Sequence, residues 1–300
     1  MKIRHFACVL GISLGFCAAA QAQQGTLDRI RAGGGITLGH RDASIPLSYL
    51  DDRQKPIGYA MDLCLKIVDA VKEELKMPDL RVNYQPITPA TRIPLLANGT
   101  IDLECGSTTN TADRQKQITF TITHFVTANR FVSKKAGGLK TFDDLKGKTI
   151  VSTSGTTNVK QANELNTARK LGINILNAKD HAEAFLMVDT GRAVAFVMDD
   201  ILLAGFVANH ADPRLFTISS EALSVEPYGI MLRKGDPAFK KVVDEAMTKL
   251  FKSGGLTAIY EKWFMKPIPP RGIVMNIPMS DAMKRVMDNP TDSPDPGVYK

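Results

Sequence analysis

The spacing of apolar residues along the chain alternates between that of helices and that of strands. From residue 62 onward, apolar side chains recur every three or four positions, which predicts a helix with one buried face: Cys64, Ile67, Val68, Val71 and Leu75. Residues 80–84 alternate apolar and polar positions, as in a half-buried strand. The wholly apolar run at 193–198 predicts a strand covered on both faces. This alternation is typical of α/β proteins with mostly parallel sheets.

Further elements continue the alternation. Strands are predicted at 36–38, 101–103, 149–151, 173–176 and 229–232. Helices are predicted at 93–98, 158–171, 180–190, 237–252 and 256–264. Asp180 and Glu183 have the spacing of a capping box at the start of the third of these helices. From residue 267 the chain is rich in proline and is predicted to be irregular.

The first 22 residues have the pattern of a secretory signal. Lys2 and Arg4 precede an apolar stretch at 6–16, and small residues at 18–22 allow cleavage after Ala22. The apolar stretch is too short to span a bilayer, which requires about 20 residues. We therefore expect an exported protein.

Composition adds size and charge to this picture. With 300 residues, 44% of them hydrophobic, the chain is long enough for two globular domains. The formal net charge of +7 indicates an anionic partner, but one Trp and 7% aromatic residues argue against a surface that stacks nucleic-acid bases. Cys64 and Cys105 remain after signal cleavage; one disulfide and two buried free thiols fit this pattern equally well.

Polar residues follow several predicted strands, at the edge where α/β sheets bind ligands. They occupy positions 40–41, 105–110, 152–157 and 199–200. The second and third of these segments combine glycine with hydroxyl side chains and lead into helices, so their backbone N–H groups favour an anion. Helix capping alone explains each turn taken singly, and neither has the pattern of a phosphate loop. Their shared position at strand ends favours one common site.

Charged residues at these strand ends suit a ligand with carboxylate and ammonium groups. Arg41, Arg92 and Arg114 match carboxylates, although a solvated surface position explains each arginine taken alone. Asp199 directly follows a buried strand and needs a cationic partner, unless it caps the next helix. His181 begins a predicted helix, where it either faces solvent or donates to an acidic ligand.

The motifs of metal sites and catalytic nucleophiles are missing from residues 23–300. That part of the sequence has no His-x-x-x-His, Cys-x-x-Cys, calcium-loop or Gly-x-Ser-x-Gly pattern. We therefore predict no metal and no cofactor.

Several short stretches, taken together, identify a family. They are 39–41, 92–96, 104–110 with 114–116, 153–157, 178–181, 191–196, 198–200 and 266–270. With them the chain resembles the periplasmic amino-acid-binding proteins of ABC transporters, most closely the glutamate/aspartate-binding branch, from about residue 27 to about residue 283.

The resemblance implies an α/β fold of the type II periplasmic-binding-protein class, with two mostly parallel sheets flanked by helices and a ligand cleft between two lobes. Lobe 1 would comprise residues 23–128 and 229–300, and lobe 2 residues 129–228, with crossings at 125–131 and 226–231. The resemblance also implies a periplasmic monomer that captures L-glutamate or L-aspartate, delivers it to the membrane permease of an ABC transporter, and has no nucleic-acid partner.

The same resemblance assigns contacts to the two α-substituents of the ligand. Arg114 would bind the α-carboxylate with help from Ser107 and Thr109, and Asp199 would bind the α-ammonium group. Three arginines and one aspartate then match the charges of glutamate, whereas glutamine would leave one arginine desolvated and poorly paired.

The remaining assigned contacts concern the ligand side chain. Arg41 and Arg92 would face its carboxylate, and Thr157 and His181 would contribute from lobe 2. Pro89 stands where close relatives have serine, which leaves the choice between glutamate and aspartate open. Two alternatives are a binding protein for glutamine or another polar amino acid, and a secreted dehydratase on the same fold. An enzyme would need an acid or base that the ligand does not occupy, and only His181 and Asp200 remain as weak candidates. We therefore do not expect an enzyme.

Overall fold

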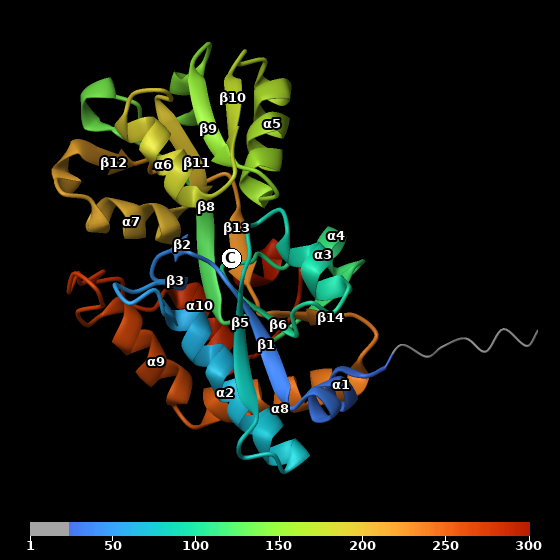
Figure 1. Ribbon diagram of the computed structural model, residues 1–300. Coiled ribbons are helices and arrows are strands. Elements are labelled where there is room, and N and C mark those ends of the chain that lie inside the picture. Colours follow the sequence, from blue (N-terminus) through green and yellow to red (C-terminus); the bar gives the residue numbers. More distant parts are fainter. Residues whose placement is uncertain (1–23) are drawn as a thin grey trace, which may run out of the picture.

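The computed structural model describes residues 24–300, which form two lobes joined by strands β8 (Phe125–Lys134) and β13 (Val225–Tyr228) (Figure 1). The predicted signal at residues 1–22 lies outside the described residues. Each lobe has one principal sheet flanked by helices, so the α/β class and the two-lobed fold are confirmed.

The sheet of the first lobe has the strand order β5-β1-β6-β14-β7. Its strands are β1 (Gly35–His40), β5 (Arg81–Pro86), β6 (Leu103–Cys105), β7 (Ile118–Phe120) and β14 (Met231–Arg233). β1 is parallel to β5 and β6, whereas β14 is antiparallel to β6 and β7. The sheet is therefore mixed, because the chain enters it again through β14 after building the second lobe.

Helices cover both faces of this sheet. Met231 and Leu232, neighbours on β14, point to opposite faces and belong to two different apolar clusters. One cluster includes α2 and α8, and the other includes α3. The helices of this lobe are α1 (Thr26–Gly33), α2 (Tyr59–Leu75), α3 (Arg92–Ala97), α4 (Ala112–Gln115), α8 (Pro237–Lys252) and α9 (Gly255–Phe264). A small sheet of β2 (Ala43–Ser44), β3 (Ser48–Leu50) and β4 (Pro56–Ile57) follows β1.

The sheet of the second lobe has the order β10-β9-β11-β8-β12. β9 (Thr149–Thr153) is parallel to β10 (Asn174–Ala178) and β11 (Ala195–Asp199), and β8 is antiparallel to β11 and β12 (Phe216–Ile218). The helices of this lobe are α5 (Thr157–Arg169), α6 (His181–Asp189), α7 (Asp200–Asn209) and the short η1 (Lys135–Gly137), η2 (Phe142–Leu145) and η3 (Pro213–Leu215). The fully buried β11 confirms the strand predicted from its apolar sequence.

The ribbon of β8 and β13 positions the lobes. β13 pairs with the first residues of β8, while the later residues of β8 pair with β11 and β12. Phe125, where β8 begins, stacks on Tyr260 and Phe264 of α9, with ring centroids 6.0 and 5.0 Å apart. The aromatic contacts therefore anchor the ribbon in the first lobe.

The C-terminal segment departs from the irregular tail that its prolines predict. It contains α10 (Asp281–Asp288) and η4 (Pro296–Tyr299), which pack near β8 and β13. Ser280 caps α10 by accepting a hydrogen bond from the backbone N–H of Met283, and Met283 and Val286 are buried. Residues 281–288 are amphipathic, and burial of their short apolar face stabilises this helix between the proline-rich segments.

Cys64 on α2 and Cys105 on β6 form a disulfide. Their Cα atoms are 6.1 Å apart, and neither residue is exposed. The structure therefore selects the bridge over the two free thiols, and it joins α2 to the strand that precedes the loop at 106–110.

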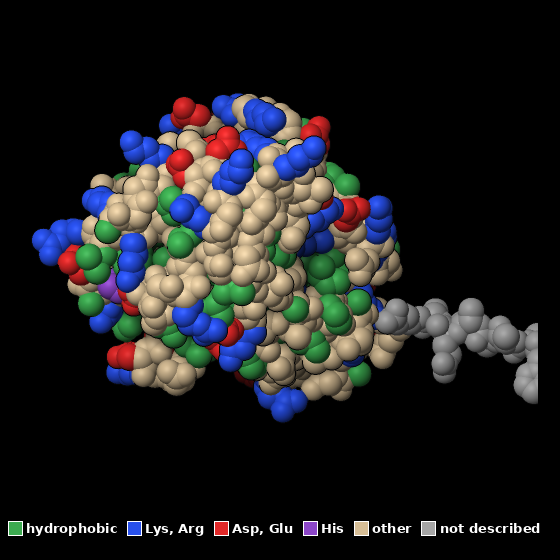
Figure 2. All heavy atoms as spheres, turned by 90° about the horizontal axis from the view of Figure 1, so that it is seen from above, with side chains coloured by type: hydrophobic (Ala, Val, Ile, Leu, Met, Phe, Trp, Pro, Cys, Tyr) green, Lys and Arg blue, Asp and Glu red, His purple; other side chains and the backbone are tan. Residues whose placement is uncertain are grey.

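Charges of both signs are mixed on the face of the molecule in Figure 2, where Lys and Arg side chains lie among Asp and Glu. Among residues 24–300, no helix combines the length and the apolarity needed to cross a membrane.

Candidate ligand-binding site

The predicted ligand residues lie at strand ends and helix starts of both lobes. Arg41 directly follows β1, Arg92 begins α3, and Arg114 is in α4. The lobe-2 residues are Thr157, the first residue of α5, His181, the first residue of α6, and Asp199, the last residue of β11. Seven of the eight predicted residues are buried, and Thr157 is half-buried: Arg41, Arg92, Ser107, Thr109, Arg114, Thr157, His181 and Asp199.

Interactions between the lobes bring these residues together. Arg114 Nη2 donates a hydrogen bond to the carbonyl of Gly155 across the interlobe gap, at 3.3 Å. Burial lowers the pKa of His181, Arg92 and Arg114; the charge of Arg41 lowers that of His181 further, whereas the charge of Asp199 opposes the lowering of the two arginine pKa values. These mutual effects show that the predicted residues of the two lobes face one another.

The three arginines are buried with few partners. Burial, and then the charge of Arg92, lowers the pKa of Arg41 and of Arg114 to about 9. Arg92 Nη1 donates to Thr108 Oγ1 at 2.5 Å, and Arg114 Nη1 donates to the carbonyl of Thr109 at 2.8 Å. Within residues 24–300, Arg41 Nη1 and Arg92 Nε are buried without any hydrogen-bond partner. The site therefore presents positive charge and free donors to an anion.

Glu104 is a buried acidic residue for which we predicted no role from the sequence. It lies on β6 between Leu103 and Cys105 and is 0% exposed. Neither of its carboxylate oxygens has a hydrogen-bond partner in the described part of the chain, yet its charge raises the pKa of all three arginines. Glu104 therefore acts as their counter-charge. Its only sequence signal is a charge within an otherwise apolar strand, and such a signal does not name its partners.

Asp199 is held from both sides by neutral hydrogen-bond donors. Asn158 Nδ2 donates to its carboxylate at 2.7 Å, and the hydroxyl of Tyr228 donates to the other oxygen. Burial and the negative charge of Glu226 raise the pKa of Asp199 to about 7. Among residues 24–300 this carboxylate forms no ion pair, and an ammonium group would supply one. The roles of Asn158, Tyr228 and Glu226 were not predicted, because they lie on α5 and β13, far in the sequence from Asp199 on β11.

The capping alternative for Asp199 is correct for its position and wrong for its side chain. Asp199 occupies the N-cap position of α7, but its side chain makes no capping hydrogen bond. The neighbouring carboxylate of Asp200 instead accepts from Thr127 Oγ1 at 2.5 Å and from Arg130 Nε at 3.1 Å. Asp199 is therefore free for another role.

His181 and Thr157 are also engaged within the second lobe. His181 is 2% exposed, so a surface position is excluded, and its Nδ1 lies 2.8 Å from Thr153 Oγ1. Burial and the charges of Arg41 and Arg92 hold the pKa of His181 well below 6.5, so its ring is neutral. Thr157 donates its hydroxyl to Glu226 at 3.1 Å.

The loop after β6 contributes Ser107, Thr108 and Thr109. Ser107 Oγ is buried and has no partner within residues 24–300, which leaves it free to donate. Thr109 forms a β-bridge with Tyr228, so the loop is fixed to the strand that also supports Asp199. No group of three or more His, Cys, Asp or Glu side chains in the described residues is arranged to hold a metal ion.

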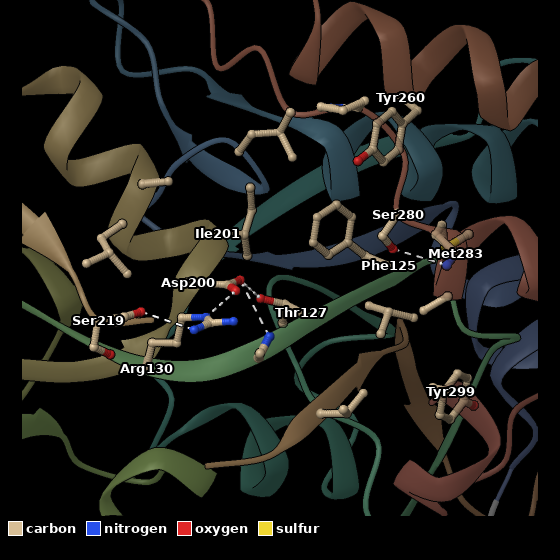
Figure 3. Close-up of a pocket in the computed structure, with 18 residues that line it drawn as sticks. Phe125, Thr127, Arg130, Asp200, Ile201, Ser219, Tyr260, Ser280, Met283 and Tyr299 are labelled. Carbon is tan, nitrogen blue, oxygen red and sulfur yellow. Dashed lines mark hydrogen bonds and ion pairs between the residues drawn. The ribbon is translucent and has the colours of Figure 1, made fainter. Parts of the chain in front are cut away.

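A separate cavity of about 490 Å³ lies on another side of the ribbon. Figure 3 shows it between Ile201 of α7, Thr127 and Arg130 of β8, and Met283 of α10. None of the eight predicted ligand residues lines it. The cavity and the candidate site are therefore distinct.

Two α/β lobes on a two-stranded ribbon, with opposed charges directed into the gap between them, define a bilobal solute-binding protein. Residues 36–266 match the family of bacterial extracellular solute-binding proteins, family 3, and the chain belongs to this family. It is therefore a solute-binding protein and not an enzyme of the same fold.

Relatives and a solved structure agree with this assignment. The chain is 53% identical, over 89% of each chain, to the L-glutamate/L-aspartate-binding protein of Pseudomonas aeruginosa. It is 48% identical, over 97% of each chain, to the glutamate/aspartate import solute-binding protein of Salmonella typhimurium. A mutant of ArgBP from T. maritima aligns with a TM-score of 0.71 and 28% identity, over 79% of this chain and 98% of that chain.

Proposed function

We propose that the mature protein captures L-glutamate or L-aspartate between its lobes and delivers it to the membrane permease of an ABC transporter. The names of relatives about half identical to this chain support the ligand class. The observation that carries the proposal is the convergence of three buried arginines opposite Asp199. We further propose a periplasmic monomer, with lobe 1 at residues 23–128 and 229–300 and lobe 2 at residues 129–228.

The charges of the site fit an acidic amino acid. In the proposed arrangement, Arg114 binds the α-carboxylate and Asp199 binds the α-ammonium group, each supplying the opposite charge. Arg41 and Arg92 face the side-chain carboxylate, and Glu104 opposes the positive charge that these two arginines have in excess of it. Charge balance matters here because a buried ion without a partner is strongly destabilising.

The free donors are placed to serve the same ligand. Arg41 Nη1, Arg92 Nε and Ser107 Oγ are buried and unpartnered among the described residues, so a ligand carboxylate would satisfy them. A neutral amide such as that of glutamine accepts fewer of these hydrogen bonds and brings no charge. Thr157 and His181 complete the proposed site from lobe 2, where the neutral ring of His181 would contribute a hydrogen bond rather than a charge.

A thermal-shift screen of ligand-stripped protein tests the proposal. At about 100 times Kd, L-glutamate or L-aspartate should stabilise the fold by about 2.7 kcal/mol. For a chain of this size, that corresponds to a rise in Tm of roughly 5–10 °C. Glutamine at the same concentration should give a much smaller rise. If neither acidic amino acid shifts Tm, or if glutamine shifts it equally, the proposed ligand class is wrong.

A further inference from the structure

Helix α7 of the second lobe meets the first lobe at a glycine. Gly205 is buried in the middle of α7. A methyl group on its Cα would lie 2.2 Å from the carbonyl oxygen and 2.9 Å from the carbonyl carbon of Ile45. Both distances are shorter than real Cβ contacts, and the obstructing atoms are backbone. Only glycine allows α7 to approach the turn between β2 and β3 this closely. Figure 1 shows α7 beside β2.

The presence of glycine here needs a reason, because glycine is less favourable than alanine inside a helix. A positive φ is not that reason: Gly205 is helical, unlike many other glycines of this chain. The approach to Ile45 therefore accounts for it. We call this approach, between Gly205 and the carbonyl of Ile45, the closure contact.

The closure contact is connected to a proposed ligand residue on each side. Asp199 directly precedes α7, so a shift of the helix moves its carboxylate. On the other side, the backbone N–H of Arg41 donates to Ser48 Oγ at 2.9 Å, and the N–H of Leu47 donates to the carbonyl of Ser44 at 2.7 Å. The turn that carries Ile45 is thus tied to the segment that carries Arg41.

We propose that Gly205 is a positioning residue for ligand capture, because the missing side chain lets the lobes close until Asp199 and Arg41 reach the same ligand. This inference rests on the proposed function. A methyl group would hold α7 away from the turn by about 1 Å. Misplacement of binding groups by about 1 Å weakens their joint action by up to about 100-fold. The ligand-free protein, with its lobes apart, would not encounter this obstacle.

A second glycine lies against the first lobe but is a poorer probe. A Cβ on Gly155 would lie 2.7 Å from Ala90 Cα and 2.8 Å from the carbonyl oxygen of Pro89. Its φ of +77°, however, disfavours any side chain whether the lobes are open or closed. A substitution at Gly155 would therefore mix backbone strain with hindered closure, whereas Gly205→Ala introduces only the methyl group.

Gly205→Ala and a control variant, Gly33→Ala, test the proposal. Gly33 is also helical, at the end of α1, and has no atom within 4 Å of its added methyl group. For each mature protein we would measure the Tm without ligand, the Kd for L-glutamate by calorimetry, and the change in radius of gyration on binding by X-ray scattering. The Gly205→Ala protein should keep or raise the ligand-free Tm, bind glutamate at least about tenfold more weakly, and contract less. Gly33→Ala should match the wild type in Kd and contraction.

Each alternative outcome has a distinct meaning. A Gly205→Ala protein that binds and contracts like the wild type would overturn the inference and leave the proposed function intact. A lower ligand-free Tm would also overturn it, since the methyl group would then disturb packing that exists before closure. If the wild type itself binds neither glutamate nor aspartate, the proposed function fails, and this inference fails with it.

Discussion

Lowering the pH from about 7 to about 5 should weaken glutamate binding strongly, because it protonates Asp199. Burial and the charge of Glu226 raise the pKa of this carboxyl to about 7 in this structure. The proposed role of Asp199 is to hold an ammonium group, which requires the ionised form. Bound ammonium would favour that form in turn and lower the pKa of Asp199, so binding releases a proton.

The size of the effect follows from the pKa. At pH 7 about half of the molecules have Asp199 ionised and at pH 5 about one in 100, so Kd should rise about 50-fold, equivalent to about 2.3 kcal/mol. Above about pH 7 the affinity should level off. Arg41 and Arg114 keep their charge over this range, since their pKa values are about 9.

Calorimetry at several pH values, in two buffers of different ionisation enthalpy, measures the Kd and the number of protons released on binding. About half a proton should be released per glutamate bound near pH 7. Asp199→Asn should bind weakly at every pH and show no such dependence.

The stability of the ligand-free fold should depend on pH in the opposite direction. Because the pKa of Asp199 is higher in the folded than in the unfolded chain, the free energy of unfolding should fall as pH rises from about 4 to 7. The Asp199→Asn variant should not show this fall. A wild-type Kd constant within twofold from pH 5 to 7 would refute the reasoning.

Two further predictions concern Arg41 and the disulfide. Arg41→Ala should weaken glutamate by roughly 10- to 100-fold in calorimetry, since it removes a charged donor that is unpartnered among the described residues, and should weaken glutamine far less. Equal losses for both ligands would show that Arg41 does not face the side-chain carboxylate. Opening the Cys64–Cys105 bridge, which joins residues 41 positions apart, should lower the free energy of unfolding by about 3–4 kcal/mol. Urea unfolding of the Cys64→Ala/Cys105→Ala variant and of reduced wild type checks this, and equal stability of oxidised and reduced wild type would contradict it.

Much of the secondary structure could be predicted because it depends on neighbours in the sequence. The apolar spacing of α2 and the apolar run of β11 both correspond to buried elements of the expected type. The N-cap of α6 also follows the prediction, since the Asp180 carboxylate accepts from the N–H of Glu183. The carboxylate of Glu183, however, accepts from Lys179 rather than from the N-cap residue, so the reciprocal half of the capping box is absent. Such local detail depends on side-chain orientation, which spacing does not specify.

Partners distant in the sequence could not be predicted in this way. In the first sheet, β14 lies between β6 and β7, although the whole second lobe separates it from them in the sequence. No local sequence pattern predicts this position. Cys64 and Cys105 meet because α2 packs on β6, whereas their spacing was equally compatible with free thiols. Glu104, Asn158 and Tyr228 acquire their roles from residues on other elements, so their types alone indicated nothing.

The sequence by itself determined which chemistry is available and where it lies on each element. Arginines and an aspartate at strand ends or in the segments that follow them were enough to predict groups for carboxylates and an ammonium, because strand ends gather at one edge of a sheet. Only the tertiary structure decided which of these groups face one another, how deeply they are buried, and therefore how their pKa values shift. The physical reason is that the two halves of the candidate site belong to different lobes. Their separation depends on the ribbon of β8 and β13 and on the close approach of α7 to Ile45, neither of which is encoded in local spacing.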